Sequence, residues 1–312
     1  MSAIETFAGW ESLPPLPSPN GGFACGVLRG NVVVLGGTNW KDDTKQWLDV
    51  IWAYDAQARQ WEVRGKLPHP LAYAVTGEWN GELIVAGGTD GRQARKEVWR
   101  IGPSLELTPS SQLREDSVLA SGDVVGESLF ILGGCADAAK LDGLHKGGER
   151  LDLPTGKVGV LAPAGDCAFG LAASLGIGRE LFVFGGVRPD LDKKYVSLSA
   201  AWAFDAGKGA WRALKPYPMP VHGSSAVKLD EHRILIAGGY GGNPPDFTAA
   251  AFIYDARRDT YTRTMDLPGA AMAGLVRAAD FVYCLGGENT KRRTAACARV
   301  TVAELLRAGG MD

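Results

Sequence analysis

Six short apolar runs along the chain each end in a pair of glycines. Counting between the second glycines of successive pairs gives 51, 46, 52, 53 and 48 residues. A continuous run rich in β-branched and aromatic residues is typical of a strand buried on both faces. The period is that of propeller blades rather than of helical repeats. The runs read VVVLGG, LIVAGG, LFILGG, LFVFGG, ILIAGG and VYCLGG, with pairs at 36–37, 87–88, 133–134, 185–186, 238–239 and 286–287.

A second marker follows the glycine pairs in several repeats. An aromatic residue precedes an aspartate, and a large side chain stands six residues after the aspartate. We expect the aspartate to start a turn by binding its own backbone. We expect the large side chain to pack the following outer strand onto the next repeat. The marker comprises Tyr54-Asp55 with Trp61, Phe204-Asp205 with Trp211, Tyr254-Asp255 with Tyr261, and a degenerate copy, Asp152 with Val158.

Small residues dominate the first strand of each repeat, as in FACGV, AYAVTG, LAASLG, SSAV and AGLV. Small side chains allow six strands to crowd around one axis, where larger ones collide. The predicted fold is therefore all-β: a six-bladed kelch-type β-propeller whose blades are four-stranded and antiparallel.

The two ends of the chain complement each other. The last repeat lacks an outer strand, and the segment GWESLPPLP near the N-terminus supplies one. Trp10 with the Leu-Pro that follows it resembles Trp61 with Leu67-Pro68. We expect the N-terminal strand to complete the last blade, which leaves no free sheet edge. Residues 1–312 are thus predicted to form one domain, with a short C-terminal helix near 303–308.

Charge and composition limit the kinds of partner that the protein is expected to bind. The net charge of −2, with both signs interspersed, gives no reason to expect nucleic acid or a membrane as partner. The five cysteines are odd in number and scattered, which favours reduced thiols in a cytoplasmic protein. We expect no signal peptide and no membrane span. The pattern leaves the oligomeric state open. The cysteines are Cys25, Cys135, Cys167, Cys284 and Cys297.

Candidate chemistry lies at one mouth of the predicted central channel. The loops after the glycine pairs and those leading into the innermost strands converge there. The candidate ligand-binding residues from these loops are Asn39, Tyr73, Asp90, Arg188, His222 and Tyr240.

The sixth of these loops reads GGENTKRRT and places a carboxylate beside three basic residues. Glu288 would transfer a proton, because neighbouring cations favour the ionised carboxylate. Arg292 or Arg293 would bind an anionic group, since guanidinium binds carboxylate bidentately. The alternative interpretation is a solvated loop with weak surface ion pairs, Lys291 included.

Two histidines, His69 and His222, stand at comparable places just before inner strands. They raise the possibility of a metal site. No third or fourth ligand stands at a recognisable spacing, so we expect no metal and interpret both as structural or substrate-contacting residues.

Several segments together resemble the cyclically permuted sialic acid mutarotases, which are kelch propellers related to bacterial N-acetylneuraminate epimerase. The resemblance covers most of the chain at the level of the repeats. Its specific parts are the first eighty or so residues and 286–294. The segments are GGTNW, DVIWAYD with Trp61, LPHPLAYAV, and GGE followed by Arg-Thr.

The resemblance implies a catalytic pair, Glu288 and Arg293, with Thr294 completing the motif. The loop here is one residue shorter than in the family, which makes Arg292 a rival for the role of Arg293. The first loop also differs, with Thr38-Asn39-Trp40 and the compact KDDTKQW in place of a longer glycine-rich segment. Substrate preference is expected to differ accordingly.

The activity implied is the interconversion of sialic acid anomers by acid/base ring opening, with a small sugar acid as substrate and no cofactor. Two other classes remain open, because one fold hosts unrelated functions. The first is a non-enzymatic kelch module that binds carbohydrate or protein. The second is a copper oxidase similar to galactose oxidase, but the tyrosine and histidine pattern of that class is missing here.

Overall fold

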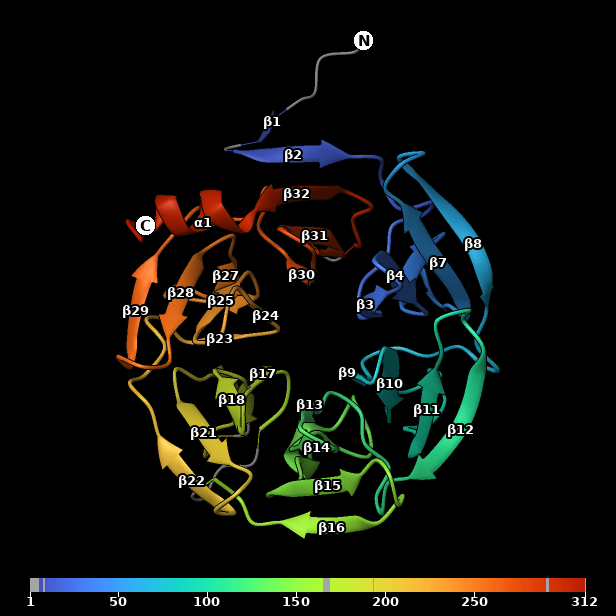
Figure 1. The fold of residues 1–312 in the computed structure, drawn as a ribbon. Helices are drawn as coiled ribbons and strands as arrows, with labels where there is room; N and C mark the ends of the chain where they lie inside the picture. The colour runs from blue at the N-terminus through green and yellow to red at the C-terminus, as the bar shows by residue number, and fades with distance from the viewer. Residues whose placement is uncertain (1–5, 8, 165–168, 193, 290–291, 312) are drawn as a thin grey trace.

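The computed structural model describes residues 6–7, 9–164, 169–192, 194–289 and 292–311. Within these residues the regular secondary structure is almost entirely β, as predicted, and the main sheets stand around a central axis like the blades of a propeller (Figure 1). Five sheets have four strands and one has five, and every strand pair in them is antiparallel.

Each main sheet begins with its innermost strand and proceeds outward. The first sheet comprises β3 (Ala24–Leu28), β4 (Asn31–Leu35), β7 (Val50–Asp55) and β8 (Gln60–Lys66). The second comprises β9 (Val75–Trp79), β10 (Glu82–Ala86), β11 (Glu97–Ile101) and β12 (Leu107–Gln112). The third comprises β13 (Ser121–Val125), β14 (Ser128–Leu132), β15 (Gly148–Asp152) and β16 (Val158–Leu161).

The remaining sheets repeat this order. The fourth comprises β17 (Ala173–Ile177), β18 (Glu180–Phe184), β21 (Ala201–Asp205) and β22 (Ala210–Ala213). The fifth comprises β24 (Ser225–Lys228), β25 (Arg233–Ala237), β28 (Ala251–Asp255) and β29 (Thr260–Arg263). The sixth comprises β30 (Met272–Ala278), β31 (Phe281–Glu288), β32 (Cys297–Thr301), β2 (Trp10–Leu13) and β1 (Thr6–Phe7).

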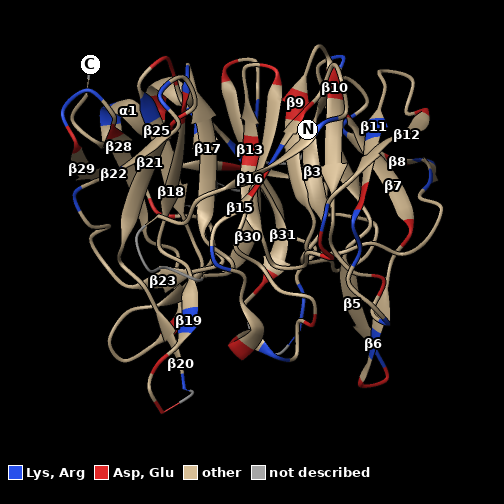
Figure 2. Cartoon of the chain, turned by 90° about the horizontal axis from the view of Figure 1, so that it is seen from below, with Lys and Arg blue, Asp and Glu red and all other residues tan. Residues whose placement is uncertain are grey.

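Short hairpins project from one end of the ring, where β5, β6, β19 and β20 lie on the same side (Figure 2). Most are formed by segments that follow the glycine pairs, while β23 leads into the inner strand of the fifth sheet. The short elements are β5 (Thr38–Lys41), β6 (Thr44–Trp47), β19 (Val187–Pro189), β20 (Tyr195–Ser197), β23 (Val221–His222), β26 (Tyr240–Gly241), β27 (Asp246–Phe247) and the 3-10 turn η1 (Leu141–Gly143).

The glycine pairs join neighbouring sheets. The second glycine of every pair donates its N–H to a carbonyl that precedes the inner strand of the adjacent sheet. The acceptors for 37, 88, 134, 186, 239 and 287 are the carbonyls of Leu71, Ser117, Phe169, Val221, Ala271 and Asn20, at 2.6–3.0 Å. A Cβ on the first glycine would lie 2.0–2.8 Å from the same six carbonyls. The repeat therefore requires glycine because backbone meets backbone there.

The N-terminal strand pairs with the last strand of the chain. β2 is hydrogen-bonded to β32, with Glu11 opposite Arg299 and Leu13 opposite Cys297. Trp10 is fully buried, and its Nε1 donates to the carbonyl of Asp266 at 2.9 Å. The predicted helix is α1 (Val302–Ala308), and Thr301 and Glu304 form a capping box at its start.

The second sequence marker behaves as predicted in one respect and differently in another. Asp55 Oδ1 accepts hydrogen bonds from the amides of Gln57 and Ala58, so it does start the turn. The large side chain, however, contacts the preceding sheet rather than the next one. Trp61 Nε1 donates to the carbonyl of Pro14 at 3.1 Å, and Trp211 Nε1 to that of Ala162 at 3.0 Å. The outer strand lies beside the sheet that comes before it around the ring, and the prediction had the direction reversed.

Candidate functional site

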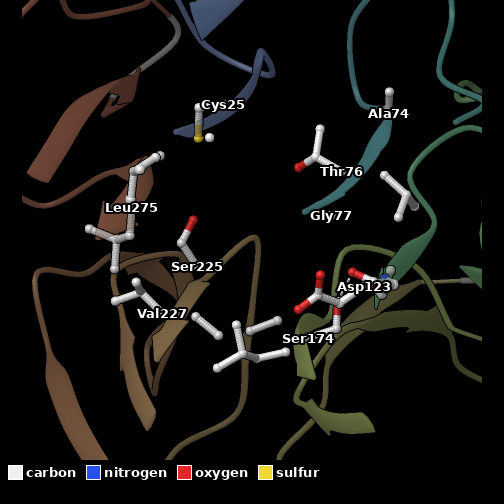
Figure 3. A pocket seen from close by; sticks show the side chains of 18 of the residues that line it. Cys25, Ala74, Thr76, Gly77, Asp123, Ser174, Ser225, Val227 and Leu275 are labelled. Carbon is white, nitrogen blue, oxygen red and sulfur yellow. Dashed lines mark hydrogen bonds between the residues drawn. The ribbon is translucent and has the colours of Figure 1, made fainter. Parts of the chain in front are cut away.

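A cavity of about 600 Å³ occupies the centre of the ring. The inner strands β3, β9, β13, β17, β24 and β30 line it, and the small residues predicted for these strands leave the space open. Serine and threonine side chains from several strands, including Thr76, Ser174 and Ser225, stand on its wall with Cys25 and Leu275 (Figure 3). A cavity of this size accommodates a monosaccharide.

Glu288 stands at one end of this cavity. It is the last residue of β31 and pairs with Met272 at the start of β30, so the strand register places it at the end where the post-glycine loops begin. Its side chain is 31% exposed and forms an ion pair with Arg293 Nη1. The two residues also form a backbone bridge across their loop. The sequence motif thus brings together the two residues that it named, while Lys291 lies outside the described residues.

Arg293 is enclosed by protein groups. Its side chain is only 3% exposed. Nε donates to Thr38 Oγ1 at 3.1 Å, Nη2 donates to the Tyr73 hydroxyl at 2.9 Å, and Nη1 faces Glu288. The guanidinium therefore ties the sixth glycine loop to the first and second repeats, and its charge is balanced by the Glu288 carboxylate.

Tyr73 lies beside this pair and lines the cavity. It adopts a left-handed backbone conformation, with φ of 57°, just before β9. Its hydroxyl oxygen accepts hydrogen bonds from Arg293 Nη2 and from Lys45 Nζ at 3.2 Å. Because both bonds use lone pairs of the oxygen, the hydroxyl proton is left to donate elsewhere.

Two carboxylates within the inner strands were not identified from the sequence. Glu78 and Asp123 line the cavity, and burial raises the pKa of both, that of Asp123 to about 7. Backbone hydrogen bonds from Gly176 and Val124 oppose this rise for Asp123. A charged residue within an inner strand of otherwise small residues was the signal that could have identified them.

His222 and Tyr240 form a separate group in the fifth repeat. They lie opposite each other on β23 and β26, with ring centroids 5.5 Å apart. His222 Nδ1 is 2.9 Å from Ser197 Oγ, and burial lowers the pKa of the imidazole to about 4. Neither ring is among the residues that line the cavity, although Gly223 is. His222 is therefore neutral at physiological pH.

Asn39, Asp90, Arg188 and Arg292 also lie outside the cavity lining. Asn39 follows Thr38 on β5, so its side chain is on the face of the hairpin away from Arg293. Asp90 forms an ion pair with Arg95 at 2.5 Å and accepts amide hydrogen bonds within its own loop. Arg188 is exposed on β19, and Arg292 is 77% exposed and pairs with Asp43 at 3.4 Å.

The four cysteines within the described residues, Cys25, Cys135, Cys284 and Cys297, are free thiols, while Cys167 lies outside them. Among the same residues, no group of three or more His, Cys, Asp or Glu side chains is placed to hold a metal ion. The one α-helix of the described chain is too short to cross a membrane.

The chain is similar in sequence to known kelch proteins. The kelch motif matches residues 19–68. N-acetylneuraminate epimerase from Brucella suis is 36% identical over 116 residues, which cover 30% of this chain and 29% of the relative. The chain thus carries a kelch motif and is similar over part of its length to the N-acetylneuraminate epimerases.

The chain is also similar to one solved structure and to a human kelch protein. The solved structure of YjhT superposes with a TM-score of 0.74 at 14% identity and covers 93% of this chain and 97% of that one, which is a likeness of fold. Human Kelch-like protein 21 is 30% identical over 102 residues, or 33% of this chain and 15% of that protein. The curated relatives are thus matched over less than a third of their own length.

Proposed function

We propose that this kelch protein is a mutarotase that interconverts the anomers of N-acetylneuraminic acid or of a closely related sugar acid. The observation that carries the proposal is Glu288, a partly exposed carboxylate that lines a cavity of monosaccharide size and is held by a buried arginine. Similarity to the epimerases supports the substrate class. We further infer that the six main sheets are the blades of a closed propeller, with this site at one mouth.

The reaction opens and recloses the sugar ring. A base removes the proton of the anomeric hydroxyl, the bond between the anomeric carbon and the ring oxygen breaks, and an acid gives a proton to that oxygen. The anomeric carbon becomes a carbonyl that rotates before the steps reverse. Every proton removed is returned, so the reaction needs no external oxidant, reductant or cofactor.

Glu288 is the proposed base, because its ionised carboxylate is the proton acceptor that faces the cavity beside Arg293. Tyr73 is the proposed acid partner. Its hydroxyl oxygen is occupied by two cationic donors, so its proton is free to point into the cavity. Arg293 holds both side chains in place, which limits the reorganisation needed during the reaction.

These few groups are sufficient for the chemistry. Mutarotation already proceeds in water, so a barrier lowered by about 3 kcal/mol accelerates it roughly a hundredfold. One positioned acid or base typically contributes that much. A single acid or base at this site therefore accounts for the required acceleration.

The test is to add the protein to freshly released α-N-acetylneuraminic acid and to follow anomer exchange by NMR. We expect acceleration over buffer with the native chain and its loss in Glu288→Gln. Glu78→Gln is the matched control, because Glu78 lines the same cavity but stands near the far end of β9. Loss of activity in the Glu78 variant alone, or no acceleration by the folded native protein, would contradict the proposal.

A kelch module that binds a partner without catalysis is the second candidate. The match to human Kelch-like protein 21 and two exposed aromatic residues on the projecting hairpins favour it, with Trp40 42% and Tyr195 56% exposed. A native protein that binds the sugar acid in the same NMR titration but leaves the exchange rate unchanged would favour this candidate.

A further inference from the structure

Arg293 is poorly accessible to a ligand. Thr38, Tyr73 and Glu288 surround its guanidinium, and only 3% of the side chain is exposed. An anionic ligand group would have to approach a guanidinium whose charge Glu288 already balances. A sugar acid that enters the cavity next to Glu288 therefore needs its cationic contact from another side chain.

Lys45 does not itself line the cavity, but it contacts Tyr73, which does, and it is placed to make the cationic contact. It lies on β6, half-buried, and its Nζ is 3.2 Å from the Tyr73 hydroxyl. The ammonium is 4.5 Å from the centre of the Trp47 ring and 5.1 Å from that of Tyr73. The ammonium of Lys45 donates one of its three N–H groups to Tyr73. It also lies near the aromatic rings of Trp47 and Tyr73, which do not neutralise its charge.

No carboxylate among the described residues forms an ion pair with Lys45. The other cations near this end differ. Arg292 pairs with Asp43 and is 77% exposed, and Arg95 pairs with both Asp90 and Glu97. Lys45 thus combines partial burial, an unbalanced charge and direct contact with a residue of the cavity wall.

We propose that Lys45 binds the carboxylate of an acidic sugar at this site. The inference rests on the proposed function in that it names the ligand contact of the same cavity. The β5–β6 hairpin explains the placement, because Thr38, Trp47, Trp40 and Lys45 are cross-strand pairs on one of its faces. That face turns toward Arg293, with Thr38 bonded to it.

The experiment measures binding without turnover. The ligands are both methyl glycosides of N-acetylneuraminic acid, whose rings cannot open, and the corresponding carboxamides, which lack the negative charge. Dissociation constants are measured by titration calorimetry for the native chain, Lys45→Gln, Lys45→Arg and Lys41→Gln. Lys41 is the matched control, because it belongs to the same hairpin but lies on its opposite face.

We expect Lys45→Gln to weaken binding of a carboxylate glycoside about ten- to a hundredfold, as for loss of a charge-assisted hydrogen bond. Its effect on the carboxamide should be small, and Lys45→Arg should keep the preference for the acid. Lys41→Gln should match the native chain. Equal losses for acid and amide, an unchanged Lys45→Gln, or a native protein that binds neither acid would overturn the inference.

The anomer exchange assay separates this inference from the proposed function. If the native chain binds the locked acid through Lys45 but does not accelerate exchange, the mutarotase proposal fails and the Lys45 assignment stands. If exchange is accelerated and Lys45→Gln binds the acid as tightly as the native chain, the Lys45 assignment alone is wrong.

Discussion

Arg293 joins three parts of the chain that lie far apart in sequence. Thr38 belongs to the first repeat, Tyr73 leads into the second, and Glu288 ends a strand of the sixth. Arg292, one position earlier, is 77% exposed and forms an ion pair with the exposed Asp43. The two arginines that the sequence left as rivals therefore differ sharply in burial, and their substitutions should have different consequences.

We expect Arg293→Gln to lower the free energy of unfolding by about 2–4 kcal/mol, because it removes one partner of a mostly buried ion pair and two hydrogen bonds. Arg292→Gln should change it by less than about 0.5 kcal/mol, as for a surface pair. Urea denaturation at pH 7 measures both. Equal values for the two variants would show that Arg293 does not link the repeats.

Folding shifts the pKa values of Asp123 and His222 in opposite directions. Burial raises the pKa of Asp123 to about 7, so between pH 4 and 7 the folded state binds more protons than the unfolded state and stability falls as pH rises. Burial lowers the pKa of His222 to about 4, so between pH 4 and 6.5 the unfolded state binds more protons and stability rises with pH. The two contributions oppose each other over most of this window.

Asp123→Asn should therefore gain stability relative to the native chain as pH rises from 4 to 7, at about 1.4 kcal/mol per pH unit at most. His222→Gln should lose stability relative to the native chain as pH rises from 4 to 6.5. Urea midpoints at four pH values give both slopes. Curves that run parallel to that of the native chain would mean that these groups keep their ordinary pKa values in the fold.

At the scale of the element, each glycine pair is an inter-sheet contact. Gly134 donates to the carbonyl of Phe169 at 3.0 Å, and a Cβ on Gly133 would lie 2.0 Å from that oxygen. Gly126 has almost the same φ, 60° against 61°, yet a Cβ there would meet nothing within 4 Å. The two positions separate the cost of a left-handed backbone from the cost of a close approach.

Gly126→Ala should destabilise the fold by about 1–2 kcal/mol, the cost of a left-handed alanine. Gly133→Ala should cost several kcal/mol more, because the third and fourth sheets must move apart at Phe169. Thermal unfolding measures the difference. Similar losses in the two variants would indicate that conformation alone, and not contact between sheets, selects the glycines.

The strands and turns were predictable from the sequence because, in each repeat, a short run of neighbouring residues specifies the buried strand and the turn. The contact between Glu288 and Arg293 was also predictable, since one short loop carries both residues. Lys45 was not a candidate from the sequence, although the alternation along the β5–β6 hairpin puts it on the face of Thr38 and puts Asn39, which was a candidate, on the other face. Its contact with Tyr73 joins two repeats, and no pattern within one repeat reveals such a contact.

At the scale of the whole molecule, the chain ends meet in the sixth sheet. β2 pairs with β32, and the amide of Gly287 donates to the carbonyl of Asn20 at 2.7 Å. Glu11 pairs with Arg299 of β32 and with Arg59 of the first sheet. The N-terminal segment therefore links the last sheet to the first. Loss of the side chain that anchors this segment should destabilise both sheets.

Trp10 is that anchor, fully buried against the fifth and sixth sheets and α1. Trp10→Ala should lower the free energy of unfolding by about 3–5 kcal/mol, while Trp10→Phe, which mainly loses the bond to Asp266, should cost less. If the strand closes the ring, Trp10→Ala shifts one cooperative transition, and amide exchange accelerates in β32 and the first sheet alike. An unchanged main transition, with faster exchange confined to β2, would instead mean that the strand is only appended to a ring already stable without it.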